Sequence, residues 1–551
     1  MKFNTAKLTL GRRRLAMRGS PANRGKVAIN DRCSAMKALH QSVLIAGFAL
    51  LPLRAGLAAL TPITAVETKV ISVTGFPTEP SHTVVSNYGF RPSVILTTNA
   101  DNSSNVAFLN ASGTGISILS IDAARNLTSR IDPAVLQSAT KLVGFARIPS
   151  DGSFAISYAK NNATNGVDFE YWIARVSSAG ATVFSTLVFG TTPKNQVGSK
   201  GEPGTFSSGR LVFNPTTQRL IAYTGHTQRY SDGVRHQGGH VVTCSLSGVL
   251  GTVTPALTSE WYCSHNFDQR LLVEGNNFYT LAHGDAYPRA LVFGRWLDGA
   301  AATSFTSNTE FFAINGTIGD NTTGTQLGAM VKLANGNFGV VYSTKQGRNN
   351  FDVRYLEITP TGVAGAQTWL TSYPANTFAI YPRIARYGDA AAVFWEEVKA
   401  GAVVAVRTKL VSTAEANATA QATVSDAAVR LPAVYDIASL PDGGILWASN
   451  RGAGSLALQR VVAPPASELR LLNVVIGKVA ANYTISGSIT GGPPLTAVYL
   501  QASSNLALSD AWQTISTITL NASGQATFGP VIDPTGSTLT KNFYRVNTVG
   551  P

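Results

Sequence analysis

The chain has 551 residues, of which 44% are hydrophobic and 13% charged, so it is too apolar for a disordered protein and long enough for a large domain and a smaller one. Its net charge of +14 is concentrated at the start: residues 1–58 hold eleven Lys or Arg and one acid, which leaves 33 basic and 29 acidic residues elsewhere. Because the charge of the rest of the chain is close to neutral, we do not predict a nucleic-acid-binding surface.

The basic start has the pattern of an export signal. An apolar run at 43–53, VLIAGFALLPL, is followed by small residues suited to cleavage near Ala58. We therefore predict a leader over 1–58 of a bacterial protein that is secreted, periplasmic or held at the cell surface. Met36 begins an ordinary leader, and an extended leader from Met1 is the alternative. No other apolar run reaches transmembrane length, so no membrane span is predicted in the mature chain.

The next part of the chain repeats one β-rich unit. Each copy has a strand, a turn that often contains Asp-Gly or Asn-Gly, a second apolar strand, a polar gap and a third strand. We count seven copies, whose turn segments begin at residues 98, 148, 213, 272, 333, 386 and 440. Such self-similarity predicts an all-β fold with a seven-bladed β-propeller over 60–463, with six or eight blades as alternatives. The strand at 66–75 is predicted to close the ring against the last blade.

The repeats stop near Pro464-Pro465, and simpler strands follow. Residues 466–551 predict a small β-sandwich-like module. The run from Ala502 to Val546 resembles the C-terminal β-modules appended to many secreted bacterial proteins. That resemblance implies packing or attachment to a cell surface for the tail, and no catalysis.

Titratable residues gather between positions 223 and 289. The chain has seven histidines, and five of them lie here: His226, His236, His240, His265 and His283. They are accompanied by arginines, tyrosines and acids, namely Arg229, Arg235, Arg270, Arg289, Tyr230, Tyr287, Asp232, Asp268 and Asp285. The rest of the chain is poor in charge, so we expect these residues to meet on one face of the propeller, around the loops of two adjacent blades.

One interpretation of this stretch is acid/base chemistry on an acidic polysaccharide. Eliminating a uronic-acid sugar requires a cation to neutralise its carboxylate, and a base and an acid to move the proton. The candidate catalytic residues are His226, Tyr230, His240, His265, Tyr287 and Arg289. The candidate substrate-binding residues are Arg229, Arg235, Arg270 and His283. The repeats look like those of secreted seven-bladed propellers, which include lectins and polysaccharide lyases, and this resemblance implies an extracellular polysaccharide as partner and a lyase-like reaction.

A second interpretation is a metal site. His236 and His240 would point the same way from an extended strand. His226, His265 or His283 would complete the set, with Asp232 or Asp285 as an oxygen ligand for one divalent metal ion. No strong ligand motif is present, and the cofactor stays unknown. A structural ion and an acid/base site can coexist.

The remaining alternatives are structural. Cys244 and Cys263 lie inside the same stretch, and in an exported protein they are predicted to form a disulfide bond, with two buried free thiols as the alternative. The histidines, acids and arginines of propeller loops also commonly hydrogen-bond between blades. A non-catalytic carbohydrate- or protein-binding adhesion propeller, with or without a structural metal ion, is thus the alternative to an enzyme.

Overall fold

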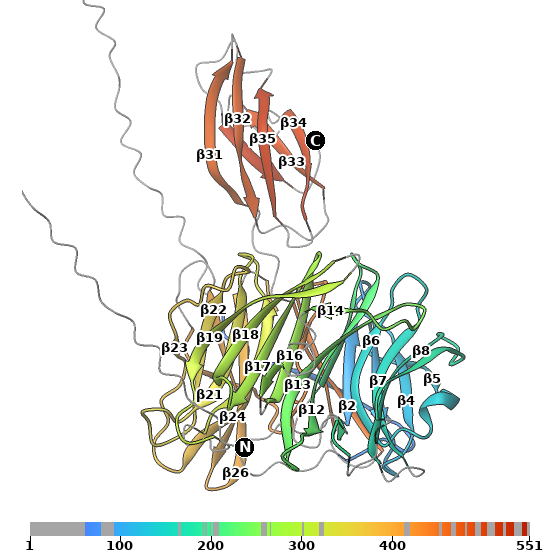
Figure 1. The fold of residues 1–551 in the computed structure, drawn as a ribbon. Helices are drawn as coiled ribbons and strands as arrows, with labels where there is room; N and C mark the ends of the chain where they lie inside the picture. The colour runs from blue at the N-terminus through green and yellow to red at the C-terminus, as the bar shows by residue number, and fades with distance from the viewer. Residues whose placement is uncertain are drawn as a thin grey trace, which may run out of the picture. The chain divides into compact units, whose positions relative to one another are not determined.

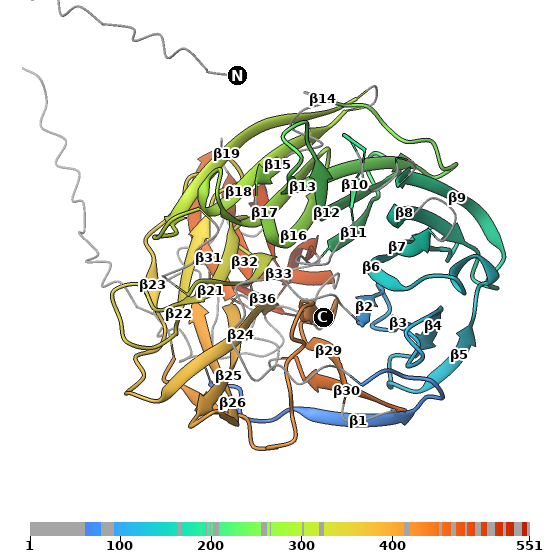
Figure 2. The ribbon, with the colours of Figure 1, turned by 60° about the horizontal axis from the view of Figure 1, so that its bottom comes forward.

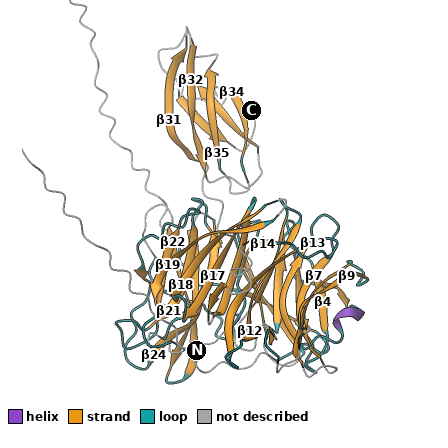
Figure 3. Cartoon of the chain, in the orientation of Figure 1, coloured by secondary structure: helices purple, strands orange, loops and turns teal. Residues whose placement is uncertain are grey.

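The computed structural model describes most of the chain after the leader. The described residues are 61–78, 93–162, 167–190, 192, 196–198, 200–201, 209–254, 262–264, 266–299, 302–318, 324–388, 390–412, 419–450, 454–463, 470–479, 482–490, 497–503, 513–521, 525–533 and 543–547. They are almost entirely strands and turns, with one 3-10 helix, η1 (Ala134–Leu136) (Figure 3). No helix among them is long and apolar enough to cross a membrane. The predicted leader lies outside the described residues.

Seven sheets of four or five strands form a ring in this part of the chain (Figures 1 and 2). Sheet 1 contains β2 (Val94–Thr98), β3 (Ser104–Leu109), β4 (Ile116–Ile121) and β5 (Leu127–Ile131). Sheet 2 contains β6 (Lys141–Arg147), β7 (Phe154–Asn162), β8 (Val167–Val176) and β9 (Thr182–Phe189). Sheet 3 contains β10 (Lys200–Gly201), β11 (Gly209–Asn214), β12 (Arg219–Arg229), β13 (Arg235–Ser245) and β15 (Tyr262–Ser264).

The other four sheets continue the ring. Sheet 4 contains β16 (Asn266–Glu274), β17 (Asn277–Asp285), β18 (Arg289–Asp298), β19 (Thr303–Ala313) and β14 (Val253–Thr254). Sheet 5 contains β20 (Gln326–Lys332), β21 (Phe338–Thr344), β22 (Asp352–Ile358) and β23 (Thr368–Trp369). Sheet 6 contains β24 (Thr377–Tyr387), β25 (Ala390–Lys399), β26 (Ala402–Ser412) and β27 (Ala422–Thr423). Sheet 7 contains β28 (Ala438–Ser439), β29 (Ile445–Asn450), β30 (Ser455–Val461) and the N-terminal β1 (Glu67–Ser72).

The ring closes through its inner strands and through β1. The first strands of neighbouring sheets contact one another in the order β2, β6, β11, β16, β20, β24 and β28, and β28 returns to β2. As predicted, β1 pairs with β30, from Glu67 opposite Arg460 to Ser72 opposite Ser455. Each pair of neighbouring sheets shares its own hydrophobic cluster, such as Phe394 and Trp447 between sheets 6 and 7, with ring centroids 5.6 Å apart. The all-β propeller prediction is confirmed.

The turns between the first and second strands follow the predicted Asp-Gly and Asn-Gly signal. In the β6–β7 turn the Asp151 carboxylate accepts hydrogen bonds from the Ser153 backbone N–H and hydroxyl, and Gly152 has a φ of +73°. The β20–β21 and β28–β29 turns repeat this arrangement with Gly336 and Gly443. Asp and Asn bond their own backbone two residues on, and glycine accepts positive φ without strain, so these dipeptides fix the hairpins.

The C-terminal strands form two three-stranded sheets. One contains β31 (Arg470–Val479), β32 (Asn482–Thr490) and β35 (Ala526–Asp533), and the other contains β33 (Ala497–Ser503), β34 (Gln513–Thr519) and β36 (Phe543–Asn547). They share a core that includes Ile485, Val498, Leu500 and Phe528. This agrees with the β-sandwich-like module predicted for the tail.

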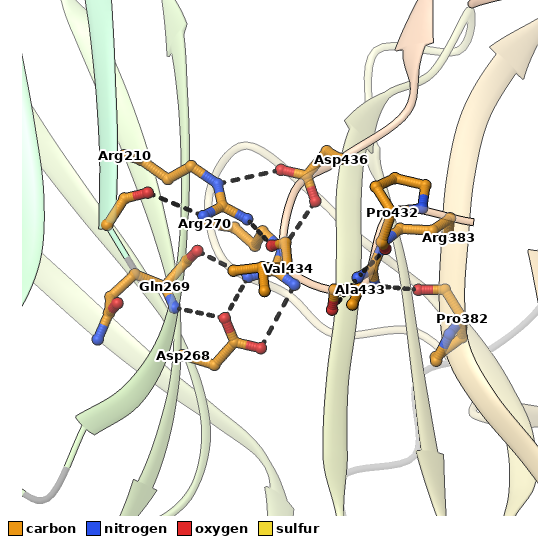
Figure 4. A network of polar contacts seen from close by, with 11 residues as sticks. Arg210, Asp268, Gln269, Arg270, Pro382, Arg383, Pro432, Ala433, Val434 and Asp436 are labelled. Carbon is orange, nitrogen blue, oxygen red and sulfur yellow. Dashed lines mark hydrogen bonds and ion pairs between the residues drawn. The ribbon is translucent and has the colours of Figure 1, made fainter. Parts of the chain in front are cut away.

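Three arginines from inner strands converge on the segment before β28 (Figure 4). Arg383 of β24 donates to the carbonyls of Pro432 and Ala433, and Arg210 of β11 donates to the carbonyl of Val434. Asp436 forms ion pairs with Arg210 (3.2 Å) and with Arg270 of β16 (2.8 Å). Arg270 is also paired with Asp268, and its side chain is almost completely buried. Side chains from distant sheets thus hold one segment at the centre of the ring.

Replacing Arg270 with methionine should destabilise the ring strongly. The change leaves Asp268 and Asp436 without a shared buried cation, and breaking a buried ion pair from one side costs about 3–5 kcal/mol. Urea unfolding followed by tryptophan fluorescence measures the loss. The matched control is Lys332→Met, which removes the exposed pair with Glu274 and should cost less than about 1 kcal/mol. Equal effects in the two variants would contradict a structural role for the central network.

Candidate functional site

The residues singled out in the sequence lie on two adjacent hairpins, β12–β13 of sheet 3 and β17–β18 of sheet 4. The short strand β15 connects them. Ser264 of β15 is paired with Gly238 of β13, and its backbone N–H donates to the carbonyl of Tyr287 in the β17–β18 turn (3.0 Å). The prediction that two neighbouring sheets supply this stretch therefore agrees with the structure. His265 lies outside the described residues.

The β12–β13 hairpin carries a polar, accessible tip. The Asp232 carboxylate accepts a hydrogen bond from the Val234 backbone N–H and contacts the His236 ring nitrogen at 2.9 Å. The hydrogen bond to His236, and then the one from Val234, lower the pKa of Asp232. The Tyr230 ring meets the His236 ring edge-on, with centroids 5.2 Å apart. This tip is therefore an ordered cluster in which the side chains of Asp232 and His236 are 52% and 40% exposed.

Two arginines face each other at the same tip. Arg229 ends β12 and Arg235 begins β13, and they are directly paired across the hairpin, one rung beyond the pair Gln228 and His236. Both side chains are half-buried. Like charges at directly opposite positions of a sheet repel each other, so this rung favours a negatively charged partner.

His226 and His240 lie below the tip, inside the protein. They belong to β12 and β13, and their ring centroids are 5.1 Å apart. Phe189 of sheet 2 packs against both rings, at 5.7 and 5.6 Å. Both histidines are buried, so they form part of the packing between sheets 2 and 3 and do not present a base to a polymer on the surface.

His283 is also buried, and its charge is disfavoured. It lies in β17 opposite Asp268 of β16. Burial lowers the pKa of His283 to about 4, although the nearby Asp268 opposes this shift. At neutral pH the imidazole is therefore uncharged, and it cannot neutralise a sugar carboxylate. Asp268 itself is engaged with Arg270.

The two remaining predicted residues differ in accessibility. Tyr287 is 71% exposed in the β17–β18 turn. Arg289 donates hydrogen bonds to the carbonyls of Ile314 and Asn315, at 3.2 and 2.9 Å, and to that of Thr317. Its guanidinium thus holds the segment after β19, while Tyr287 is available to a ligand.

Of the proposed metal ligands, the structure brings Asp232 and His236 into contact, but it keeps His240 away from His236. His236 and His240 lie on one continuous strand, and four residues of strand separate them by about 13 Å. His236 and His240 thus lie on the same face of β13 but too far apart to bind one metal ion. Among the described residues, no group of three or more His, Cys, Asp or Glu could hold a metal. The side chain of Asp285 is outside the description.

The predicted disulfide bond is wrong. Cys244 and Cys263 are both buried and are not joined to one another. Cys263 lies beside the step from Gly238 to Gly239 in β13, and Cys244 lies five residues farther along that strand. The separation is about 17 Å along the strand, far beyond the ~7 Å between Cα atoms that a disulfide tolerates.

The sequence analysis missed Arg210, Arg383 and Asp436 of the central network. A weak signal was present, because each arginine precedes a run of apolar residues in an inner strand: GRLVF at 209–213, QRLLV at 269–273 and PRIA at 382–385. Asp436 has no such pattern. Its partner Arg210 is 226 residues away in the sequence, and only the closed ring brings them together.

No protein-family model matches the chain, and no curated protein matches it. Solved structures with similar folds include BBS1N in complex with ARL6DN (11% identity, TM-score 0.35, covering 73% of this chain and 97% of that one). Another is an α-L-arabinanase from Penicillium chrysogenum (13% identity, TM-score 0.32, covering 71% of this chain and 98% of that one). A third is the α-L-arabinofuranosidase Arb93A from Fusarium graminearum (12% identity, TM-score 0.35, covering 58% of this chain and 92% of that one). At these TM-scores the function must be argued from the residues of this chain.

The buried His283 should make the free energy of unfolding depend on pH. Its pKa is about 4 in the folded protein and about 6.5 when unfolded, so the unfolded chain binds the proton more tightly. The free energy of unfolding should therefore fall as the pH drops from about 6.5 toward about 4, by up to about 3 kcal/mol from this group. His283→Gln should flatten that dependence in urea unfolding, whereas the exposed control His236→Gln should retain it. An unchanged slope in His283→Gln would show that other groups dominate.

The two buried cysteines should behave as protected thiols. Burial raises the pKa of Cys244 to about 12, which suppresses the reactive thiolate. Alkylation followed by mass spectrometry should label Cys244 and Cys263 slowly in the native protein. Both should be labelled rapidly in urea without reductant. If the cysteines are labelled in urea only after reduction, they are joined by a disulfide bond in the native protein, as the sequence predicted.

Proposed function

We propose that the protein is an exported propeller that binds an extracellular acidic polysaccharide at the tips of β12–β13 and β17–β18, without cleaving it. The observation that carries the proposal is the rung of two opposed arginines, Arg229 and Arg235, at an accessible tip. Two positive charges side by side attract a polyanion, and the guanidinium fork suits carboxylates. Tyr230, His236 and Tyr287 add aromatic and polar surface beside them.

The lyase-like reaction has less support. It needs a base within hydrogen-bonding reach of the sugar, and His226, His240 and His283 are all buried. Arg289 and Arg270 are occupied by carbonyls and carboxylates of the protein itself. Binding requires only the half-buried arginines and the exposed side chains at the hairpin tips, so it is the function that the geometry favours. Export rests on the leader pattern at 1–58.

Affinity electrophoresis in gels that contain polygalacturonate tests this proposal. The protein should be retarded by polygalacturonate and not by neutral dextran, and the effect should weaken with salt because exposed charges are screened. The double variant Arg229→Gln/Arg235→Gln should bind at least tenfold more weakly. The matched control is Arg295→Gln, an arginine of sheet 4 that bonds the carbonyl of Thr361.

Two results would contradict the proposal. Retention that is equal in the double variant would move the binding surface elsewhere. A rise in near-ultraviolet absorbance during incubation with polygalacturonate would reveal unsaturated sugar products and make the protein a lyase. Tyr230→Phe would then test whether this tip carries the chemistry.

A further inference from the structure

A cavity of about 480 Å³ lies between sheets 1 and 2. It is formed by the β2–β3 and β6–β7 turns together with the adjoining parts of β3, β4 and β5. These turns join first to second strands, whereas the candidate site lies on turns that join second to third strands. Antiparallel strands place these two kinds of turn at opposite ends of a sheet, so the cavity opens on the other face of the ring.

One wall of the cavity is a fixed network of amides and hydroxyls. The Asn99 side-chain amide donates to Asn105 (3.1 Å) and to the Ser103 hydroxyl (2.8 Å). The Asn105 amide donates in turn to the Ser120 hydroxyl (3.2 Å). Asn105 is only 4% exposed, so the network is anchored in the protein. Such a wall offers donors and acceptors at set positions, which is what recognition of hydroxyl groups requires.

The opposite part of the cavity carries the guanidinium of an arginine, Arg147. Within the described residues, the half-buried Arg147 makes no hydrogen bond or ion pair. Of the nearby acids, Asp151 pairs with Arg175, and Asp101 accepts hydrogen bonds from Ser103. These hydrogen bonds, and then the charge of Arg147, lower the pKa of Asp101. Gly152 leaves room beside the guanidinium, because a methyl group there would lie 3.7 Å from it.

An acceptor lies in the same cavity. Asp122 receives hydrogen bonds from the backbone and side-chain nitrogens of Asn126, at 2.6 and 2.9 Å. These bonds lower the pKa of Asp122, so it is a carboxylate at neutral pH. A ligand that fits must therefore be negative at one place, next to Arg147, and must donate hydrogen bonds at another, next to Asp122. A purely anionic or a purely neutral ligand satisfies only half of these groups.

We propose that this cavity binds one uronate sugar residue. Arg147 would hold the carboxylate through its planar fork, and Asp122, Asn105 and Ser120 would accept and donate hydrogen bonds to the hydroxyl groups. The volume lies in the range of small-ligand sites. The site shares no residue with the β12–β13 tip, so it goes beyond the proposed function and does not depend on it.

Isothermal titration calorimetry of the full chain tests the proposal, with sodium glucuronate, glucose and sodium acetate titrated separately. Glucuronate should bind with saturation, and glucose and acetate should each bind at least tenfold more weakly. Arg147→Gln should weaken glucuronate binding at least tenfold, and Ser120→Ala should weaken it severalfold. Arg295→Gln, in sheet 4, should leave it unchanged. Circular dichroism and urea unfolding check that the Arg147 variant is folded, and Arg147→Lys, with intermediate binding expected, replaces it if it is not.

The contrary outcomes are distinct. No saturable binding of glucuronate, or equal binding by Arg147→Gln, would overturn the site. Equal affinity for acetate would make it a carboxylate site without sugar recognition, and equal affinity for glucose would remove the role of the charge. Loss of glucuronate binding in Arg235→Gln alone would place the sugar at the β12–β13 tip. The Arg147 variant is also run in the polygalacturonate gels. Retardation there without glucuronate binding by the unaltered protein would mean that this site fails while the proposed function holds.

Discussion

The fold depends on the charged network at the centre of the ring. The inner strand of sheet 7, β28, has only two residues, so the segment before it has few backbone partners. Its carbonyls at Pro432, Ala433 and Val434 accept hydrogen bonds from Arg383 and Arg210 instead. Buried carbonyls need partners, and charged donors form the stronger bonds. Burial, and then the neighbouring Arg270, lower the pKa of Arg383 to about 10, which still leaves it protonated at neutral pH.

The same network decides which residues remain for function. Asp436 binds Arg210 and Arg270, Arg270 binds Asp268, and Asp268 lies opposite His283 in the next strand. Residues of catalytic type are therefore committed to holding sheets 3, 4, 6 and 7 together. The side chains at the hairpin tips lie outside this network. This division explains how a stretch can be rich in His, Asp and Arg while several of these residues serve to hold the sheets together.

The sequence predicted what is local and periodic. Strand alternation, Asp-Gly and Asn-Gly turns and the repeat gave the propeller, and β1 was correctly placed as the closing strand. Properties that depend on position along a strand could not be predicted from the sequence. Eighteen residues between Cys244 and Cys263 look short in sequence, but Cys244 lies near the end of β13, whereas Cys263 of β15 lies beside Gly238 and Gly239, about five residues earlier on that strand. His236 and His240 share a face, but the rise of an extended strand keeps them apart. Whether a histidine near a hairpin faces solvent or the next sheet depends on neighbours such as Phe189, which no pattern around the histidine reveals.

The two proposed sites differ in physical character as well as in place. At the β12–β13 tip, Arg229 and Arg235 are half-buried charges on a hairpin whose Asp232 and His236 are exposed, so attraction there is screened by salt and tolerates many arrangements of negative charge. In the cavity, Arg147 acts beside amides and hydroxyls that already hold one another, and a ligand must match those fixed positions. Long-range attraction without strict geometry suits an extended polymer, whereas a preorganised wall suits a single sugar residue. A propeller can carry both because each face is built from a different set of turns, and a change in one set leaves the strands that support the other unaltered.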